Sequence, residues 1–170
     1  MKKSILHIIL FTLTLSVLSA CKVKYSFSGA DVDPNIKTAS ISYIDNNSGN
    51  GPANMGDLIT DALREKILRE TNLNLVNGKA DIEFKGVISQ YYYTVQAPTG
   101  NETSDLRRIT MIINVDYKNN ITETDSWNNK FQNFAEHSVN IDLTSIEEES
   151  ITIINELLVD QIFNKAFVKW

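Results

Sequence analysis

The chain has 170 residues, 42% of them hydrophobic, and a formal charge of −5 at pH 7. This length fits one domain with a sizeable buried core, and the acidic balance argues against nucleic-acid binding, which requires clustered Lys and Arg. The single cysteine excludes a disulfide framework and a metal site of the Cys-x-x-Cys kind.

The first predicted element is a secretory signal peptide over residues 1–20. Lys2 and Lys3 form a short basic start, Ile5–Val17 is an apolar run, and small residues precede Cys21. The apolar run is shorter than the roughly 20 residues that span a bilayer. Cleavage before Cys21 would change the formal charge of the chain from −5 to −7, because Lys2 and Lys3 are removed.

Cys21 is the predicted lipid-attachment site. The sequence Leu18-Ser19-Ala20-Cys21 resembles the lipobox of bacterial lipoproteins, in which the thiol receives a diacylglyceryl group, the signal is cut before the cysteine and the new amine is acylated. The alternative is an ordinary signal peptide with a chance cysteine nearby, or an uncleaved anchor. The resemblance implies a covalent lipid on Cys21 and no other cofactor.

The residues after Cys21 bear on the membrane in which the protein is retained. In lipoproteins, an aspartate at this position tends to favour the inner membrane, and an acidic cluster is linked to surface export. Lys22–Lys24 fits neither pattern, so the resemblance implies the periplasmic face of the outer membrane. Residues 21–35 are predicted to be a lipidated tether with a turn at Asp33–Asn35, and three of its side chains are candidates to dock on the domain: Tyr25, Phe27 and Val32.

The first half of the domain alternates between strand and helix patterns. Apolar and polar residues alternate over Ile36–Ile44, which predicts a strand whose buried side carries Ala39, Ile41 and Tyr43. Met55–Glu70 has apolar residues at helical spacing and charges opposite them, which predicts a helix with one face on a sheet. A short strand over Leu73–Val76 and a turn at Asn77-Gly78 follow.

Long strands and a final helix complete the chain. In Asp81–Gln96 the apolar phase shifts near Ser89-Gln90, which indicates a bulge. After a loop over residues 97–105, Leu106–Tyr117 alternates regularly except at Ile112, and Trp127–Val139 alternates less regularly. Residues 144–168 are predicted to be a helix that starts with a capping box at Thr144.

This order of elements predicts an α+β fold. We expect a mostly antiparallel or mixed sheet of four to five strands, with two helices packed on one face and the other face more exposed. Residues 36–170 form one domain in this prediction, preceded by the tether and the cleaved signal peptide.

The sequence predicts no catalytic residue and no metal ligand. His137 is the one histidine left after residues 1–20, so no histidine pair can hold a metal, and no GxSxG, P-loop or dinucleotide fingerprint occurs. Glu147–Glu149 are interpreted as a solvated helix N-terminus. The protein is therefore predicted not to be an enzyme.

Arg107 and Arg108 are the one local basic feature, directly after the predicted loop. They are either two surface arginines on opposite faces of a strand, one of them paired with an acidic neighbour, or a contact for phosphate or carboxylate, which arginine binds through two parallel hydrogen bonds. Tyrosines 91–93 would supply an apolar wall. Arg108, which shares its face with Thr110, is the first candidate for a ligand or partner contact.

Several stretches resemble a known family. They are the lipobox, residues 21–30 (CKVKYSFSGA), 36–43 (IKTASISY), 71–76 (TNLNLV), 100–110 (GNETSDLRRIT) and 162–170 (IFNKAFVKW). Together they resemble the LptE-like lipopolysaccharide-assembly lipoproteins of the outer membrane. The resemblance implies a protein facing the periplasm or the lumen of an LptD-like β-barrel, which assists assembly of that barrel and delivery of lipopolysaccharide, with lipopolysaccharide itself as a second partner.

Two other classes of function remain open from the sequence. One is a lipoprotein pilotin or scaffold for a different outer-membrane complex, which co-purification of another barrel would favour. The other is a periplasmic carrier of a hydrophobic ligand, which a large apolar cavity between sheet and helices would favour.

Overall fold

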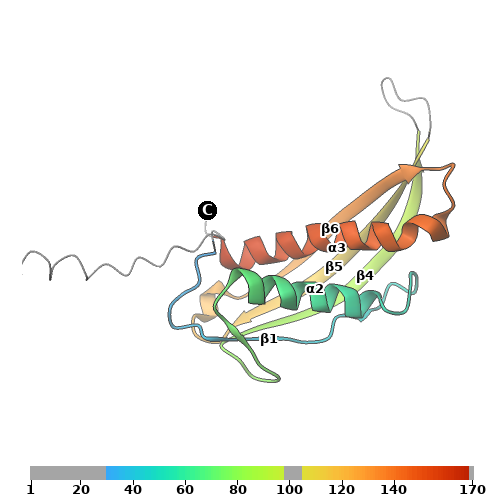
Figure 1. The fold of residues 1–170 in the computed structure, drawn as a ribbon. Helices are drawn as coiled ribbons and strands as arrows, with labels where there is room; N and C mark the ends of the chain where they lie inside the picture. The colour runs from blue at the N-terminus through green and yellow to red at the C-terminus, as the bar shows by residue number, and fades with distance from the viewer. Residues whose placement is uncertain (1–29, 98–104, 169–170) are drawn as a thin grey trace, which may run out of the picture.

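The computed structural model describes residues 30–97 and 105–168 (Figure 1). The elements in chain order are β1 (Thr38–Ile41), β2 (Asp45–Asn46), α2 (Met55–Glu70), β3 (Asn74–Leu75), β4 (Ile82–Gln96), β5 (Leu106–Asn119), the 3-10 helix η1 (Glu123–Asp125), β6 (Trp127–Ser138) and α3 (Leu143–Phe167).

The strands form one mixed sheet in the order β3-β1-β4-β5-β6, with the short β2 also paired to β4. β1 runs parallel to both β3 and β4, while β4, β5 and β6 form an antiparallel meander. α2 connects β1 and β2 to β3. The predicted α+β class is confirmed, with six strands in place of four to five.

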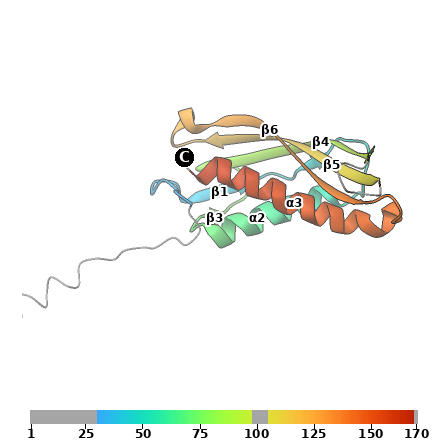
Figure 2. The ribbon, with the colours of Figure 1, turned by 90° about the horizontal axis from the view of Figure 1, so that it is seen from above.

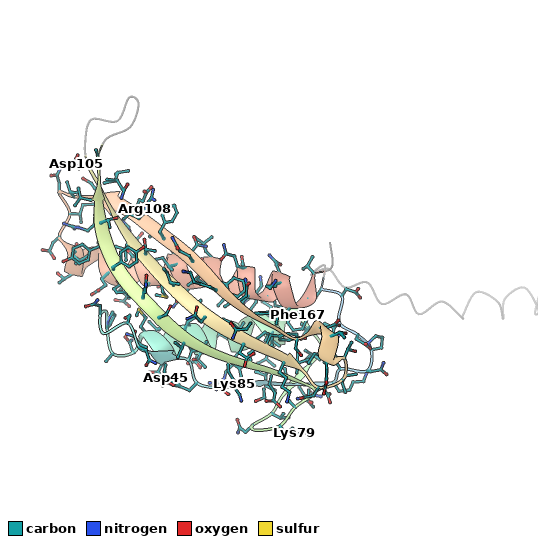
Figure 3. All side chains as sticks on the ribbon, turned by 180° about the vertical axis from the view of Figure 1, so that it is seen from behind. Asp45, Lys79, Lys85, Asp105, Arg108 and Phe167 are labelled. Atoms are coloured by element: carbon teal, nitrogen blue, oxygen red, sulfur yellow. The ribbon has the colours of Figure 1, made fainter. Side chains whose placement is uncertain are left out.

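Both helices lie side by side on one face of the sheet, and the other face is open (Figures 2 and 3). The colours of Figure 1 show that α2 and α3 run in the same direction. Buried apolar side chains from the sheet and both helices fill the space between the two layers, among them Ile59, Leu63, Ile113, Ile154 and Leu158. This packing confirms the predicted two-layer arrangement.

The additional strand is the short β2, which comes directly after the predicted strand Ile36–Ile44, and the predicted strand itself is interrupted. β1 ends at Ile41, and the amide of Ile44 donates a hydrogen bond to Thr60 Oγ1 of α2 at 3.0 Å. This contact turns Ile44 into the core and leaves Tyr43 49% exposed. The prediction that Tyr43 lies on the buried side is therefore wrong.

The bulge in β4 lies where the phase shift predicts it. The register of β4 against β5 shifts between Ile88 and Gln90, and the Ser89 hydroxyl donates to the carbonyl of Ile112 at 3.2 Å. Because the bulge inserts one residue, Tyr91 turns toward the helices and Tyr92 toward the open face. The bulge thus decides which side chains reach each face beyond it.

The N-cap of α3 lies two residues before Thr144, the N-cap residue that the capping box predicts. Asp142 is the N-cap residue, and its side chain accepts a hydrogen bond from the Thr144 amide at 2.9 Å. The Thr144 hydroxyl contacts the same carboxylate, and both groups hold the pKa of Asp142 below its ordinary value. Glu147 instead accepts a hydrogen bond from the Tyr91 hydroxyl at 3.1 Å, which joins α3 to β4.

The described chain starts at the other end of α3. The amide of Asp31 donates to the carbonyl of Phe167 at 2.7 Å, and Val32 packs against the core. Ile36 donates to the carbonyl of Asp33 at 2.9 Å, which closes the predicted turn. Tyr25 and Phe27, the other docking candidates, lie outside the described residues.

Gly56 marks the closest approach of α2 to the sheet. A Cβ atom at this position would lie 2.3 Å from the carbonyl oxygen of Ile44 and 2.9 Å from the Tyr43 hydroxyl. We expect Gly56→Ala to lower the free energy of unfolding by about 1–3 kcal/mol, because the helix must shift, although alanine is intrinsically the better helix former.

Denaturant unfolding of Gly56→Ala measures this effect. Leu68→Ala is the control, since Leu68 lies on the same helix and is exposed, and its change should stay within about 0.5 kcal/mol. A Gly56→Ala protein as stable as the unmodified protein would show that α2 can move outward freely.

Candidate functional site

Arg107 and Arg108 lie at one end of the sheet, here called the sheet tip. It comprises residues 92–96 of β4, 106–110 of β5 and 134–138 of β6, and Figure 3 shows Asp105 and Arg108 at this end. Residues 98–104 of the predicted loop lie outside the described residues. The two arginines point to opposite faces of the sheet, as their adjacent positions on a strand predict.

Arg108 lies on the open face, and its charge is paired. Its Nη2 atom is 2.7 Å from Glu136 Oε1 on the neighbouring strand, and its Nε donates to the same oxygen at 2.8 Å. The guanidinium carbon lies 4.2 Å from the centre of the Phe134 ring, within range of a cation–π interaction. The interpretation of one arginine as the partner of an acidic neighbour is therefore right for Arg108.

Arg107 lies on the side of the sheet that the helices cover, and its polar contacts differ from those of Arg108. Its Nη1 donates to the carbonyl of Ile141 at 2.8 Å, and within residues 30–97 and 105–168 no carboxylate oxygen comes within 4 Å of it. A guanidinium carries five N–H donors, so most of the hydrogen-bonding capacity of Arg107 is unused by the described residues.

Arg107 lines a surface hollow of about 440 Å³, here called the tip hollow, together with Tyr93 and residues 139–143. Two apolar side chains that line it are strongly exposed, Tyr93 by 58% and Ile141 by 44%. Val95, which lies opposite Arg107 on β4, is exposed by 60%. The tip hollow thus combines a guanidinium with an apolar rim and with the Asp142 carboxylate, whose pKa the charge of Arg107 helps to lower. This combination suits a molecule that carries an anionic group next to hydrocarbon.

An aromatic row crosses the open face at the same end. Tyr92, Thr110 and Phe134 lie side by side on β4, β5 and β6. Thr110 is buried, whereas both aromatic rings remain accessible. The sequence did not reveal this row, because it depends on the bulge in β4 and on the β5–β6 register.

His137 makes a structural contact. Its Nε2 atom is 2.9 Å from the hydroxyl of Ser150, which is fully buried and donates its proton to the carbonyl of Ile146 at 2.6 Å. The Ser150 hydroxyl can therefore only accept from His137. Within the described residues, no group of three or more His, Cys, Asp or Glu side chains is placed to hold a metal ion.

In the part of the chain that the structure describes, neither helix is long and apolar enough to cross a membrane.

Comparisons with known proteins agree with the resemblance found in the sequence. Residues 36–166 match the family model of LptE, described as lipopolysaccharide-assembly. No curated protein matches the sequence.

Similar folds occur among solved structures. Uncharacterized lipoprotein B from Nitrosomonas europaea is 14% identical, with a TM-score of 0.52 over 85% of this chain and 88% of that one. A minor lipoprotein from Acinetobacter baumannii is 15% identical, with a TM-score of 0.48 over 80% of this chain and 99% of that one. At such identities the likeness concerns the fold alone.

The family match includes every described strand and helix except the last residue of α3, and thus the sheet tip and both layers of the fold. The chain belongs to the LptE lipopolysaccharide-assembly family, and its role is in the assembly of lipopolysaccharide in the outer membrane.

Proposed function

We propose that this protein is a non-enzymatic lipoprotein that assists assembly of an LptD-like barrel and delivery of lipopolysaccharide. The family match over residues 36–166 supports the role, and the lipobox at Cys21 supports a covalent lipid anchor. In this proposal the domain faces the periplasm or the barrel lumen. A hydrophobic-ligand carrier is less well supported, since core side chains fill the space between sheet and helices.

We further propose the tip hollow as the place where lipopolysaccharide is contacted. Lipopolysaccharide carries phosphate groups beside acyl chains, and the hollow offers an incompletely used guanidinium beside Tyr93, Val95 and Ile141. Arg107 is a better candidate than Arg108, because Glu136 already neutralises Arg108. Because the net charge of the chain is negative, attraction of the anionic lipid must depend on the local positive charge of Arg107.

Arg107→Ala is expected to weaken lipopolysaccharide binding about tenfold or more, because a hydrogen bond to a charged group contributes about 1.5–3 kcal/mol. Arg108→Ala is the matched control, with the same loss of charge one residue away, and should have a smaller effect. The measurement is the affinity of each purified, folded variant for lipopolysaccharide. If Arg107→Ala, Arg108→Ala and the double variant all bind like the unmodified protein, the assignment of the tip hollow is wrong.

The proposed role is tested by depleting the protein in cells. Depletion should reduce both the lipopolysaccharide at the cell surface and the amount of correctly folded LptD-like barrel, measured by its electrophoretic mobility before and after heating. Normal amounts of both after complete depletion would refute the role. Re-expression of the Arg107→Ala variant in the depleted cells distinguishes the role in barrel assembly from the role in lipopolysaccharide delivery. The variant should restore the folded barrel but not full delivery of lipopolysaccharide.

A further inference from the structure

A groove of about 430 Å³ runs between α2 and α3 on the side away from the sheet. Figure 1 shows α2 and α3 next to each other. α2 contributes Leu58, Ala62 and Glu65 to its walls, and α3 contributes Asn155 and Glu156. None of these residues belongs to the sheet tip, so the groove is separate from the site described above.

Asn155 lines the groove from α3 and carries an unsatisfied hydrogen-bond acceptor. Its side chain is 4% exposed, and its Oδ1 atom has no hydrogen-bond partner among the described residues. A buried amide oxygen without a donor loses its hydration and gains nothing in exchange. The groove is therefore suited to an occupant that brings a hydrogen-bond donor to this oxygen.

The charged side chains along the groove determine which charge an occupant should carry. Lys66 is already engaged, with its Nζ 2.9 Å from Asp160 and 3.4 Å from Glu70, and Asp160 raises the pKa of Lys66. Arg69 also lines the groove, with its Nε 3.4 Å from Glu70 Oε1. By contrast, Glu65 and Glu156 have no cation within 4 Å in the described part of the chain. The groove therefore offers two unpaired carboxylates and a buried acceptor to a segment that is cationic and rich in donors.

The chain itself carries such a segment just outside the described residues. Lys22–Tyr25 contains two lysines, one valine and a tyrosine hydroxyl. The described chain begins at Ala30, beside Phe167 at the end of α3. Asn155 lies twelve residues before Phe167, which is about 18 Å along the helix axis.

The segment is long enough to reach the groove. Lys24 lies six residues before Ala30, so an extended chain can place it about 20–22 Å away, and its side chain extends this distance further. The lysines can thus come level with Glu156, and Tyr25 can come within range of Asn155.

We propose that Lys22–Tyr25 binds in the groove between α2 and α3. Lys22 and Lys24 pair with Glu65 and Glu156, and a donor of this segment satisfies Asn155 Oδ1. Cys21 then lies against the helix layer, so an anchor at Cys21 holds this layer toward the membrane and leaves the open sheet face and the tip accessible. The proposal is independent of the partner assigned to the sheet tip.

Engineered disulfides in the full-length protein test the proposal. Val23→Cys combined with Ala62→Cys places one thiol in the segment and one in the groove. Val23→Cys combined with Leu157→Cys is the control, because Leu157 lies two residues from Asn155 but outside the groove, and is exposed. After reduction and controlled oxidation, mass spectrometry identifies which thiols have joined.

We expect the groove pair to form its disulfide about tenfold faster or more than the control pair, since binding raises the effective concentration of the two thiols. Equal rates for the two pairs would overturn the proposal. A disulfide between two molecules would also overturn it, because the groove would then receive the segment of a second copy.

The charge pairing has its own test in the same assay. The double variant Glu65→Gln with Glu156→Gln should reduce the difference in the rate of disulfide formation between the groove pair and the control pair. Added salt should have the same effect, because it screens exposed charges. Glu148→Gln with Glu149→Gln is the control, since it removes the same charge from exposed positions of α3 outside the groove. If both double variants behave alike, the pairing of the lysines with Glu65 and Glu156 is wrong.

Discussion

Ile113→Ala is expected to lower the free energy of unfolding by about 2–5 kcal/mol, the range for truncation of a buried isoleucine. Ile113 is fully buried on the helix side of β5, the central strand of the meander. It lies opposite Ile88 on one neighbouring strand and Phe131 on the other. Removing its side chain leaves a cavity where three strands meet the helices, and rigid neighbours on both sides limit collapse.

Denaturant unfolding of Ile113→Ala and Asn114→Ala compares the loss of stability at a buried and at an exposed position of the same strand. Asn114 is the next residue along the strand, points to the open face and is exposed, so its truncation should change the free energy of unfolding by at most about 0.5 kcal/mol. A loss below about 1 kcal/mol for Ile113→Ala would mean that the interface between sheet and helices is loosely packed.

Cys21→Ser is expected to abolish acylation completely, because the lipid is attached through the thiol in the lipobox interpretation. Each buried methylene contributes about 0.8 kcal/mol to membrane attachment, so loss of two or three acyl chains removes the anchor. Labelling with a radioactive fatty acid, followed by membrane fractionation, measures both effects.

Ser26→Ala is the control for this prediction, since it makes a similarly small change five residues further along the chain. It should keep the label and the membrane fraction of the unmodified protein. Undiminished label in Cys21→Ser would show that the lipid is attached to another residue, and would contradict the lipobox interpretation.

The elements that the sequence predicts well depend on local patterns. Met55–Glu70 begins and ends where its helical spacing predicts, and the bulge at Ser89 follows from a phase shift visible in one strand. The interruption after Ile41 depends on a hydrogen bond between Ile44 and Thr60, sixteen residues away. No pattern within Ile36–Ile44 contains that information.

The same distinction applies to the candidate site. Alternation along a strand predicts that Arg107 and Arg108 point to opposite faces. Which of them is paired depends on the register that brings Glu136 beside Arg108, across 28 residues of sequence. The carbonyl of Ile141 that holds Arg107 comes from the turn before α3, where the predicted helix start was two residues late. The sequence therefore singled out the arginine pair as a candidate, but not which of the two guanidinium groups lacks an acidic partner.

Purification of the full-length protein from outer membranes tests most directly the proposal that it is the assembly partner of an LptD-like barrel. The protein should be isolated in mild detergent without crosslinking, and the barrels that co-purify should be identified by mass spectrometry. We expect an LptD-like barrel in an amount comparable to the protein itself. Recovery of a different barrel in its place, or of no barrel, would contradict the claim.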